Sequence, residues 1–181
     1  MTKKIISTLV VSLLAATSMT AFASMTKAEY GMAKDQIKAD YKAAKAACSS
    51  MTGNAKDICV VEAKGNEKVG KADLEARYTG KEKAQYNLRI AKAEAAYDVA
   101  KEKCDDATGN AKNVCVKEAK ATQIKAKADA KMTKAVKNAA TDAMDERMTA
   151  DYKVAIEKCD ALSGDAKSAC VANAKTKFNK S

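Results

Sequence analysis

Apolar positions along the chain recur at helical spacing, but most of them are small. A tyrosine and an alanine precede a cysteine by seven and four residues in three places, and another alanine follows a second cysteine by four. Because residues three, four and seven apart share one side of a helix, each copy predicts two helices with facing stripes. The stripe residues are Tyr41, Ala44 and Ala63 in the first copy, Tyr97, Ala100 and Ala119 in the second, and Tyr152, Ala155 and Ala174 in the third.

Each copy holds two cysteines eleven positions apart around a glycine, as in ACSSMTGNAKDICVVEAK, KCDDATGNAKNVCVKEAK and KCDALSGDAKSACVANAK. Eleven residues of straight helix span about 16 Å, whereas a disulfide needs Cα atoms roughly 4.4–6.8 Å apart. A turn at the glycine removes this conflict. The glycine is expected to end one helix in the left-handed conformation, and the next residue to cap the following helix. These predicted turn and cap residues are Gly53 and Asn54, Gly109 and Asn110, and Gly164 and Asp165.

The first 23 residues form a separate segment. MTKKIISTLVVSLLAATSMTAFAS has two lysines, an apolar run from Ile5 to Ala21, and Ala21-Phe22-Ala23 as a small-residue cleavage site. This pattern is typical of a bacterial secretory signal peptide, cut between Ala23 and Ser24. The run is diluted by serines and threonines and is marginal for spanning a bilayer. We expect export to the periplasm or beyond, with no transmembrane segment after cleavage.

An even number of cysteines in a secreted chain favours oxidised pairs. Six cysteines allow fifteen connectivities, and local spacing selects one of them. Each bridge closes a loop of about a dozen residues, worth ~3 kcal/mol in the chain-entropy account, which matters for a chain with few large aliphatic residues. The predicted disulfides are Cys48–Cys59, Cys104–Cys115 and Cys159–Cys170.

Break signals between the hairpins divide the chain. Gly80 in RYTGKEK is the strongest, and a softer break is expected from Asn138 to Thr141 in VKNAATDAMDE. Helices of about 27 residues, near 40 Å long, would then run up and down five or six times. The predicted fold is all-α, either a loose up-and-down bundle or an elongated string of stapled hairpins. Its expected units are the signal peptide at 1–23 and hairpin repeats at 24–80, 81–138 and 139–181.

Composition narrows the function classes. The 181 residues include no histidine, tryptophan or proline. Without histidine there is no imidazole base, no histidine-paired cysteine nucleophile and no histidine metal ligand. Adjacent acids such as Asp105-Asp106 and Asp145-Glu146 diverge by about 100° on a helix and indicate solvated surface. We expect a non-enzymatic protein without a cofactor.

A soft-metal or redox-responsive site is the alternative interpretation of the cysteines, which together with methionines suit Cu(I) or Zn(II). Each hairpin supplies two thiolates, whereas tetrahedral zinc takes four ligands. Met51 lies in the first hairpin loop, but Ala107 and Leu162 replace it in the other copies. The C-x-x-C spacing of thioredoxin-like sites is missing. Structural disulfides are therefore the favoured interpretation.

The chain is basic, with 33 Lys+Arg against 23 Asp+Glu and a formal net charge of +10. Only Arg77, Arg89 and Arg147 are arginines. A phosphate group would therefore be bound mainly by lysine ammonium groups, which act as point charges, and not by the bidentate guanidinium group of arginine. Aromatic residues are too few to stack on bases, and no nucleic-acid partner is expected. The charge predicts loose attraction to anionic envelope material such as lipopolysaccharide, acidic phospholipid headgroups or peptidoglycan carboxylates. The plain alternative is that lysine and glutamate keep alanine-rich helices in solution.

The tandem C…GNAK…CV.EAK hairpins resemble those of small secreted Gram-negative proteins rich in alanine and lysine, which often carry cell-envelope or TolA-like labels. The hairpin motif matches at all three sites and covers most of the chain beyond the signal peptide. The resemblance implies an all-α envelope protein and supplies no activity. We expect a periplasmic or secreted helical protein acting as a spacer, adaptor or weak polyanion binder. Its expected partner is anionic envelope material or another envelope protein, and thin alanine seams could also pair two copies of the chain.

Overall fold

The computed structural model describes residues 25–180, and helices fill almost all of this range. No strand occurs in it, which confirms the all-α prediction. None of the helices from residue 25 onward has a stretch long and apolar enough to cross a bilayer. The predicted signal peptide lies outside the described residues. The elements are α1 (Lys27–Ala47), the 3₁₀ turn η1 (Cys48–Ser50), α2 (Gly53–Thr79), α3 (Glu82–Lys103), the 3₁₀ turn η2 (Cys104–Asp106), α4 (Gly109–Asp160) and α5 (Gly164–Lys177).

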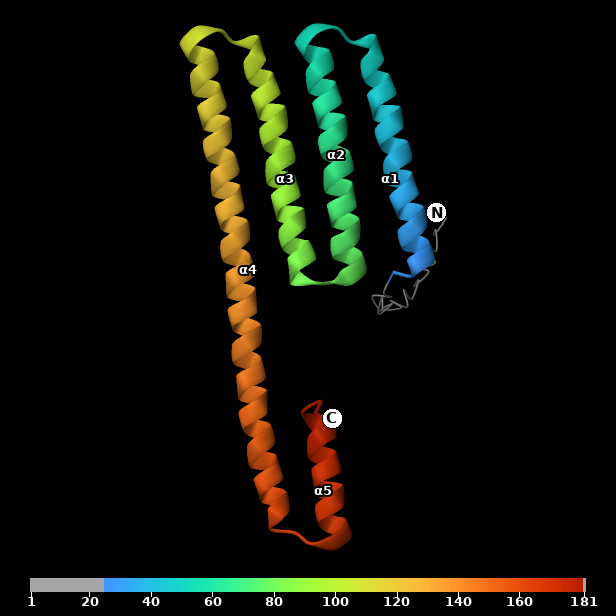
Figure 1. Ribbon diagram of the computed structural model, residues 1–181, viewed down its shortest axis with the longest axis vertical. Helices are drawn as coiled ribbons and strands as arrows, with labels where there is room; N and C mark the ends of the chain where they lie inside the picture. The colour runs from blue at the N-terminus through green and yellow to red at the C-terminus, as the bar shows by residue number, and fades with distance from the viewer. Residues whose placement is uncertain (1–24, 181) are drawn as a thin grey trace, which may run out of the picture.

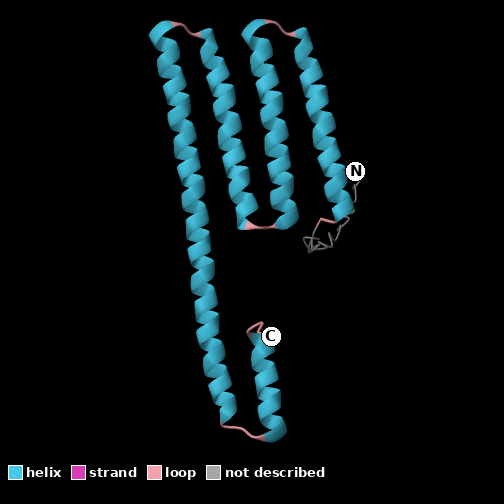
Figure 2. Ribbon diagram, viewed as in Figure 1, coloured by secondary structure: helices cyan, strands magenta, loops and turns pink. Residues whose placement is uncertain are grey.

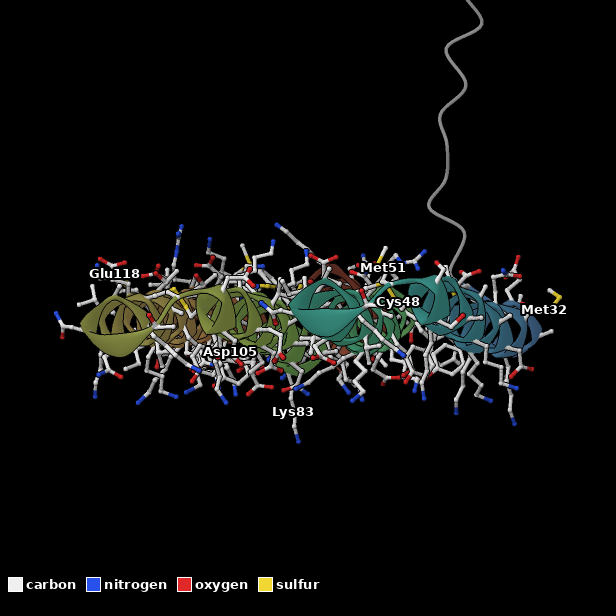
Figure 3. All side chains as sticks on the ribbon, turned by 90° about the horizontal axis from the view of Figure 1, so that it is seen from above. Met32, Cys48, Met51, Lys83, Asp105 and Glu118 are labelled. Atoms are coloured by element: carbon white, nitrogen blue, oxygen red, sulfur yellow. A yellow bond between two sulfur atoms is a disulfide. The ribbon has the colours of Figure 1, made fainter. Side chains whose placement is uncertain are left out.

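The helices stand side by side in a single flat layer. Consecutive helices run antiparallel, and each packs against its neighbours in the sequence (Figure 1). Seen from above, they form one row with side chains on both faces (Figure 3). The arrangement is therefore an open, elongated up-and-down array of the three stapled hairpins, in agreement with the predicted fold. α5 lies on the same side of α4 as α3 does, at the far end of that long helix (Figure 2).

Each hairpin tip carries the disulfide that its local spacing predicts. Cys48 is bonded to Cys59, Cys104 to Cys115 and Cys159 to Cys170, with Cα–Cα distances of 5.7, 5.7 and 5.6 Å. These distances fall within the usual range of about 4.4–6.8 Å. The first cysteine of every pair is fully buried. The bridges therefore hold the two helices of each hairpin together next to the turn.

The turn glycines have the expected left-handed conformation but a different place in the turn. Gly53, Gly109 and Gly164 have φ values of +58°, +56° and +56°. Each is the first residue of the returning helix, and not the residue that ends the outgoing one. The outgoing helices α1 and α3 end just before the cysteine, where a 3₁₀ turn tightens the chain. The reversal is thus made by the residues between cysteine and glycine, with the glycine completing it.

The predicted caps are wrong for the same reason. Because the returning helix begins at the glycine, its N-cap is the residue before it. The side chain of that residue makes no capping hydrogen bond. Asn54, Asn110 and Asp165 lie inside the first helical turn and do not cap it. The observed N-cap residues are Thr52, Thr108 and Ser163.

α4 continues through the break expected from Asn138 to Thr141. It has 52 residues, against 27 in α2 and 22 in α3, and is about 78 Å long. The stretch contains neither glycine nor proline, and the Thr141 hydroxyl donates to the Lys137 carbonyl oxygen at 3.0 Å. Asn, Thr and Asp each cost at most ~0.7 kcal/mol relative to alanine, too little to end a helix among many alanines. The boundary expected at 138/139 therefore falls inside one helix.

Small residues fill the seams between helices. An apolar cluster of Ala76, Ala84 and Leu88 lies beside the α2–α3 turn. Gly80 ends α2 there with a left-handed φ of +62°, as predicted. Leu74 is the one fully buried large aliphatic side chain of residues 25–180. The layer is thus held by close alanine contacts and by disulfides, with little of the large apolar core that stabilises most domains.

Candidate functional site

The disulfides leave no thiol for other chemistry. All six cysteines lie within the described residues, and all are paired. Residues 25–180 contain no group of three or more cysteine, aspartate or glutamate side chains placed to hold a metal ion. Met51 is exposed in the first hairpin loop. In this conformation the cysteines act as structural crosslinks.

Asn54 has a role that its position in the turn did not reveal. Its side-chain amide donates to the carbonyl oxygen of Glu102, near the end of α3, at 3.2 Å. This hydrogen bond joins the tips of the first and second hairpins, which lie at the same end of the layer (Figure 1). The third tip, at Gly164, lies at the opposite end. The predicted turn residues therefore do not come together in one site.

The flat layer has two faces, and Glu94 on α3 marks one of them. Its carboxylate accepts hydrogen bonds from Lys68 of α2 at 2.5 Å and from Lys127 of α4 at 2.7 Å. A side chain that reaches helices on both sides of its own must stand on a face of the layer and not in a seam. Lys83 is eleven residues before Glu94, hence about 20° from it around the helix, and points straight out of the layer (Figure 3). We call this side the lysine face.

Lysines run along this face at spacings of three, four and seven residues, which keep side chains on one side of a helix. On α4, positions 117, 120, 124, 127, 131 and 134 are all lysine except Ile124. Fewer carboxylates than lysines lie here: the same helical geometry places Asp35, Asp57, Glu75, Glu94 and Asp98 on this face, and Glu102 lines one groove together with Lys64, Lys68 and Lys101. The lysines are Lys27, Lys34, Lys38 and Lys45 on α1, Lys64, Lys68 and Lys71 on α2, Lys83 and Lys101 on α3, and Lys117, Lys120, Lys127, Lys131 and Lys134 on α4.

Tyrosine rings of α3 support two of the α4 lysines. Lys120 lies over Tyr97 and Lys134 over Tyr86, each with its Nζ 5.0 Å from the ring centroid. Such cation–π contacts contribute about 0.5–1 kcal/mol at exposed sites and leave the ammonium group open to solvent on its other side. Tyr97 belongs to the repeated stripe that the sequence predicts. Its contact with lysine was not predicted, because it depends on which helix becomes the neighbour.

Hydrogen bonds on this face fix the protonation of two groups. Bonds from Lys127 and Lys68 lower the pKa of Glu94. Tyr30 donates to Glu75 at 2.9 Å, and this bond raises the pKa of Tyr30. Both effects favour the form present at neutral pH, a charged carboxylate and a neutral phenol. The face therefore keeps this pattern of charge and hydrogen bonding across the neutral range.

The opposite face carries charges of both signs. Glu62, Asn66 and Lys103 line a shallow groove between α2 and α3 there, and Lys103 Nζ lies 3.6 Å from a Glu62 carboxylate oxygen. Arg77 Nε lies 2.8 Å from a carboxylate oxygen of Asp73. An anion approaching this side meets mixed charge, whereas one approaching the lysine face meets mainly ammonium groups. The spacing of the α4 lysines can be seen in the sequence. That these lysines lie on the same face as the lysines of the other helices is known only from the flat layer.

Comparison of the chain with family models, curated proteins and solved structures finds no match. Function is therefore inferred from the lysine face and from the architecture that presents it.

Proposed function

We propose that this is an exported, non-enzymatic helical protein of the periplasm whose lysine face binds phosphate-bearing lipid headgroups of the envelope. The rigid layer then acts as a spacer or adaptor at that surface. The observation that carries the proposal is the concentration of lysines on one face of a flat layer. Three disulfides are typical of a protein that folds outside the reducing cytoplasm. The signal-like N-terminus and the resemblance to secreted Gram-negative proteins support the periplasm in particular.

A flat basic face suits a flat anionic surface. Four helices at 8–10 Å spacing and about 40 Å long give a face of roughly 30 by 40 Å. Each lysine near an anionic bilayer contributes about 1 kcal/mol, and an ammonium group accepts headgroups of different shapes as a point charge. At 0.15 M salt the Debye length is about 8 Å, so the lysines act only on charges close to them. Binding should therefore be broad in specificity and sensitive to salt.

Two double variants with the same change in net charge test the role of the face. Lys83→Glu with Lys131→Glu reverses two lysines on the lysine face. Lys92→Glu with Lys158→Glu reverses two lysines, one on each of the same two helices, α3 and α4, on the opposite face. Lys92 is nine residues after Lys83 and Lys158 is 27 after Lys131, so each control position is about half a turn from its counterpart. All four lysines are exposed.

Co-sedimentation of the oxidised protein with phosphatidylglycerol-containing vesicles, and with pure phosphatidylcholine vesicles, gives the readout. We expect binding only to the anionic vesicles, released by moderate salt. The lysine-face variant should bind at least ~10-fold more weakly, and the control variant nearly as well as the native protein. Equal losses in both variants would show that net charge alone matters. No binding of the native protein at low salt would overturn the proposal.

A further inference from the structure

The outer edge of α4 is an apolar helix face that no other part of residues 25–180 covers. On α4 the buried residues Gln123, Ala130 and Cys159 mark the side that packs on α3 and α5. Nine residues along a helix correspond to about 900°, which is half a turn from the starting point. The residues nine positions from these three therefore point outward. They are Val114 and Met132 opposite Gln123, Ala121 and Ala139 opposite Ala130, and Ala150 opposite Cys159.

Large apolar side chains are exposed along this edge. Val114 is 47% exposed, and Met132 and Val136 are each 62% exposed. Glu118 stands at this end of the row of helices, and Met32 of α1 at the other end (Figure 3). The edge continues past the region that α3 covers, because α4 is a single straight helix of 52 residues. We define the α4 edge as Val114, Ala121, Ala128, Met132, Val136, Ala139, Ala143 and Ala150.

The internal repeat identifies this edge as a surface that packs on a helix. The first two copies are 56 positions apart, from Cys48 to Cys104. Gly65 on α2 contacts Ala95 of α3, and Ala72 and Ala76 belong to the cluster at the same seam. Shifting these three α2 positions by 56 gives Ala121, Ala128 and Met132, which lie on the α4 edge. The edge thus repeats the side of α2 that packs on α3, without a following helix.

We propose that a second copy of this chain covers the α4 edge, with the two α4 helices antiparallel and a twofold axis at Met132. In this register, residues whose numbers add to 264 lie opposite each other. Every apolar residue of the edge except Ala139 then meets another apolar residue, and Ala139 meets the aliphatic stem of Lys125. The pairs are Val114 with Ala150, Ala121 with Ala143, Ala128 with Val136, and Met132 with Met132 of the second copy.

Charges beside the edge fit the same register. Glu118 comes near Arg147 of the second copy on one flank, and Lys117 near Glu146 on the other, each pair occurring twice. A twofold axis normal to the layer keeps each face of the layer on the same side of the dimer. Residues that lie on the same flank of the edge in the two copies therefore meet. Parallel pairing would need a twofold axis along α4, which would turn the lysine faces of the two copies to opposite sides of the assembly. The antiparallel arrangement therefore pairs opposite charges on both flanks and keeps the lysine faces of the two copies on one side.

The other edge of the layer is a poorer partner. Suppose that α1 of a second copy packed on the α4 edge in the way that α3 packs on α2. The shift of 56 positions would then relate the residues of the two contacts. Val61 and Asp98, which line one groove of the α2–α3 seam, would be replaced by Lys117 and Lys42. This contact would oppose like charges, and it would leave free edges that add further copies. The twofold contact closes the assembly at two chains and continues the lysine face across both.

Sedimentation velocity of the oxidised protein over a range of concentrations tests the proposal. We expect a dimer, and Met132→Arg should raise its dissociation constant by at least ~10-fold, because two like charges meet on the axis. Met144→Arg is the matched control: Met144 is 64% exposed on the same helix but outside the edge. It should leave the dimer intact. Circular dichroism establishes that both variants keep their helix content. A monomer at all concentrations, or equal effects of the two variants, would overturn the proposal.

Charge exchange tests the register. Glu118→Arg alone and Arg147→Glu alone should each weaken the dimer, and the two together should restore it. Met132→Cys should form a covalent dimer on mild oxidation, since its equivalent lies directly across the axis. If Met32→Cys formed covalent dimers and Met132→Cys did not, α1 would be the contact between copies and the α4 pairing would be overturned. Failure of the double exchange to restore dimerisation would overturn the antiparallel register.

Discussion

Gly65 of α2 lies directly against Ala95 of α3, and a Cβ placed on Gly65 would be 3.0 Å from the Cβ of Ala95. Few real Cβ atoms approach this closely, so the absence of a side chain at position 65 sets the distance between the two helices. Both residues lie in the interior of a helix, where glycine normally costs about 1 kcal/mol relative to alanine. The close seam between the first two hairpins explains why glycine is used here.

Replacing two helical glycines separates the effect of packing from that of helix propensity. Gly31 lies in α1 with nothing within 4 Å of an added Cβ, so Gly31→Ala should stabilise the protein by about 0.5–1 kcal/mol. Gly65→Ala gains the same propensity but must push the helices apart, and Gly65→Leu should destabilise by about 1–3 kcal/mol. Urea unfolding followed by circular dichroism measures all three. A stabilising Gly65→Leu would contradict the close seam.

Local features of the fold could be predicted from the sequence because they depend on short spacings. Two cysteines eleven apart around a glycine can pair only if the chain reverses, and Gly80 is one glycine between two long helical patterns. The cap positions were missed because the residues between cysteine and glycine, and not the glycine, begin the reversal. The break expected from Asn138 to Thr141 was wrong because several weak helix formers do not add up to a stop when alanines surround them.

The flat layer and its lysine face could not be predicted because alanine seams carry little directional information. Leu88 and Ala91 mark one side of α3, but many alanines elsewhere would pack equally well on either side. Which helices become neighbours is then decided by contacts such as Gly65 with Ala95 and Gly70 with Ile37. The lysine stripes were present in the sequence as a spacing. They form one basic surface because all four helices turn their lysine stripes toward the same face of the layer.

The third hairpin should depend most on its disulfide. α5 has 14 residues, and an isolated helix of this length is marginal in water. Within the described residues it packs against α4, and the ring centroids of Tyr152 and Phe178 lie 6.1 Å apart in an edge-on contact. Replacing both Cys159 and Cys170 with serine removes the bridge and should lower the free energy of unfolding of this hairpin by about 3 kcal/mol. We expect amide hydrogen exchange in α5 to rise by more than ~10-fold while α2 and α3 stay protected.

The matched control removes the Cys48–Cys59 bridge. α1 has 21 residues, and the hydrogen bond from Tyr30 to Glu75 ties its far end to α2. Exchange in α1 should therefore rise less than exchange in α5 does in the third-hairpin variant. Equal increases in both, or identical thermal melts of the native protein with and without reductant, would contradict the view that disulfides replace a core here.

Continuity of α4 can be tested at a single position. Thr141 lies between Lys137, which contacts Glu82 at the start of α3, and Thr149, which accepts a hydrogen bond from Lys180 after α5. It is exposed, and its hydroxyl donates to the Lys137 carbonyl oxygen. Thr141→Pro removes a helical hydrogen bond and costs about 3 kcal/mol, so α4 should bend or break there. Thr141→Ala, at the same position, should keep the helix straight. Small-angle X-ray scattering should show a shorter maximum dimension only for the proline variant, and an unchanged one would contradict the long single helix.

Acid should weaken the seams on both sides of α3 through Glu94. Hydrogen bonds from Lys127 and Lys68 lower its pKa in the folded state, so its contribution to stability is complete above the unfolded value near 4.5. That contribution is lost as the pH falls through the lower folded value. Glu94→Gln should therefore be less stable than the native protein at pH 7, and the difference should narrow as the pH is lowered below about 4.5. Urea unfolding at a series of pH values measures this difference. About 1 M salt, where the Debye length is near 3 Å, should shrink it at pH 7 as well. A difference that stays constant with pH would mean that Glu94 contributes through packing and not through its charge.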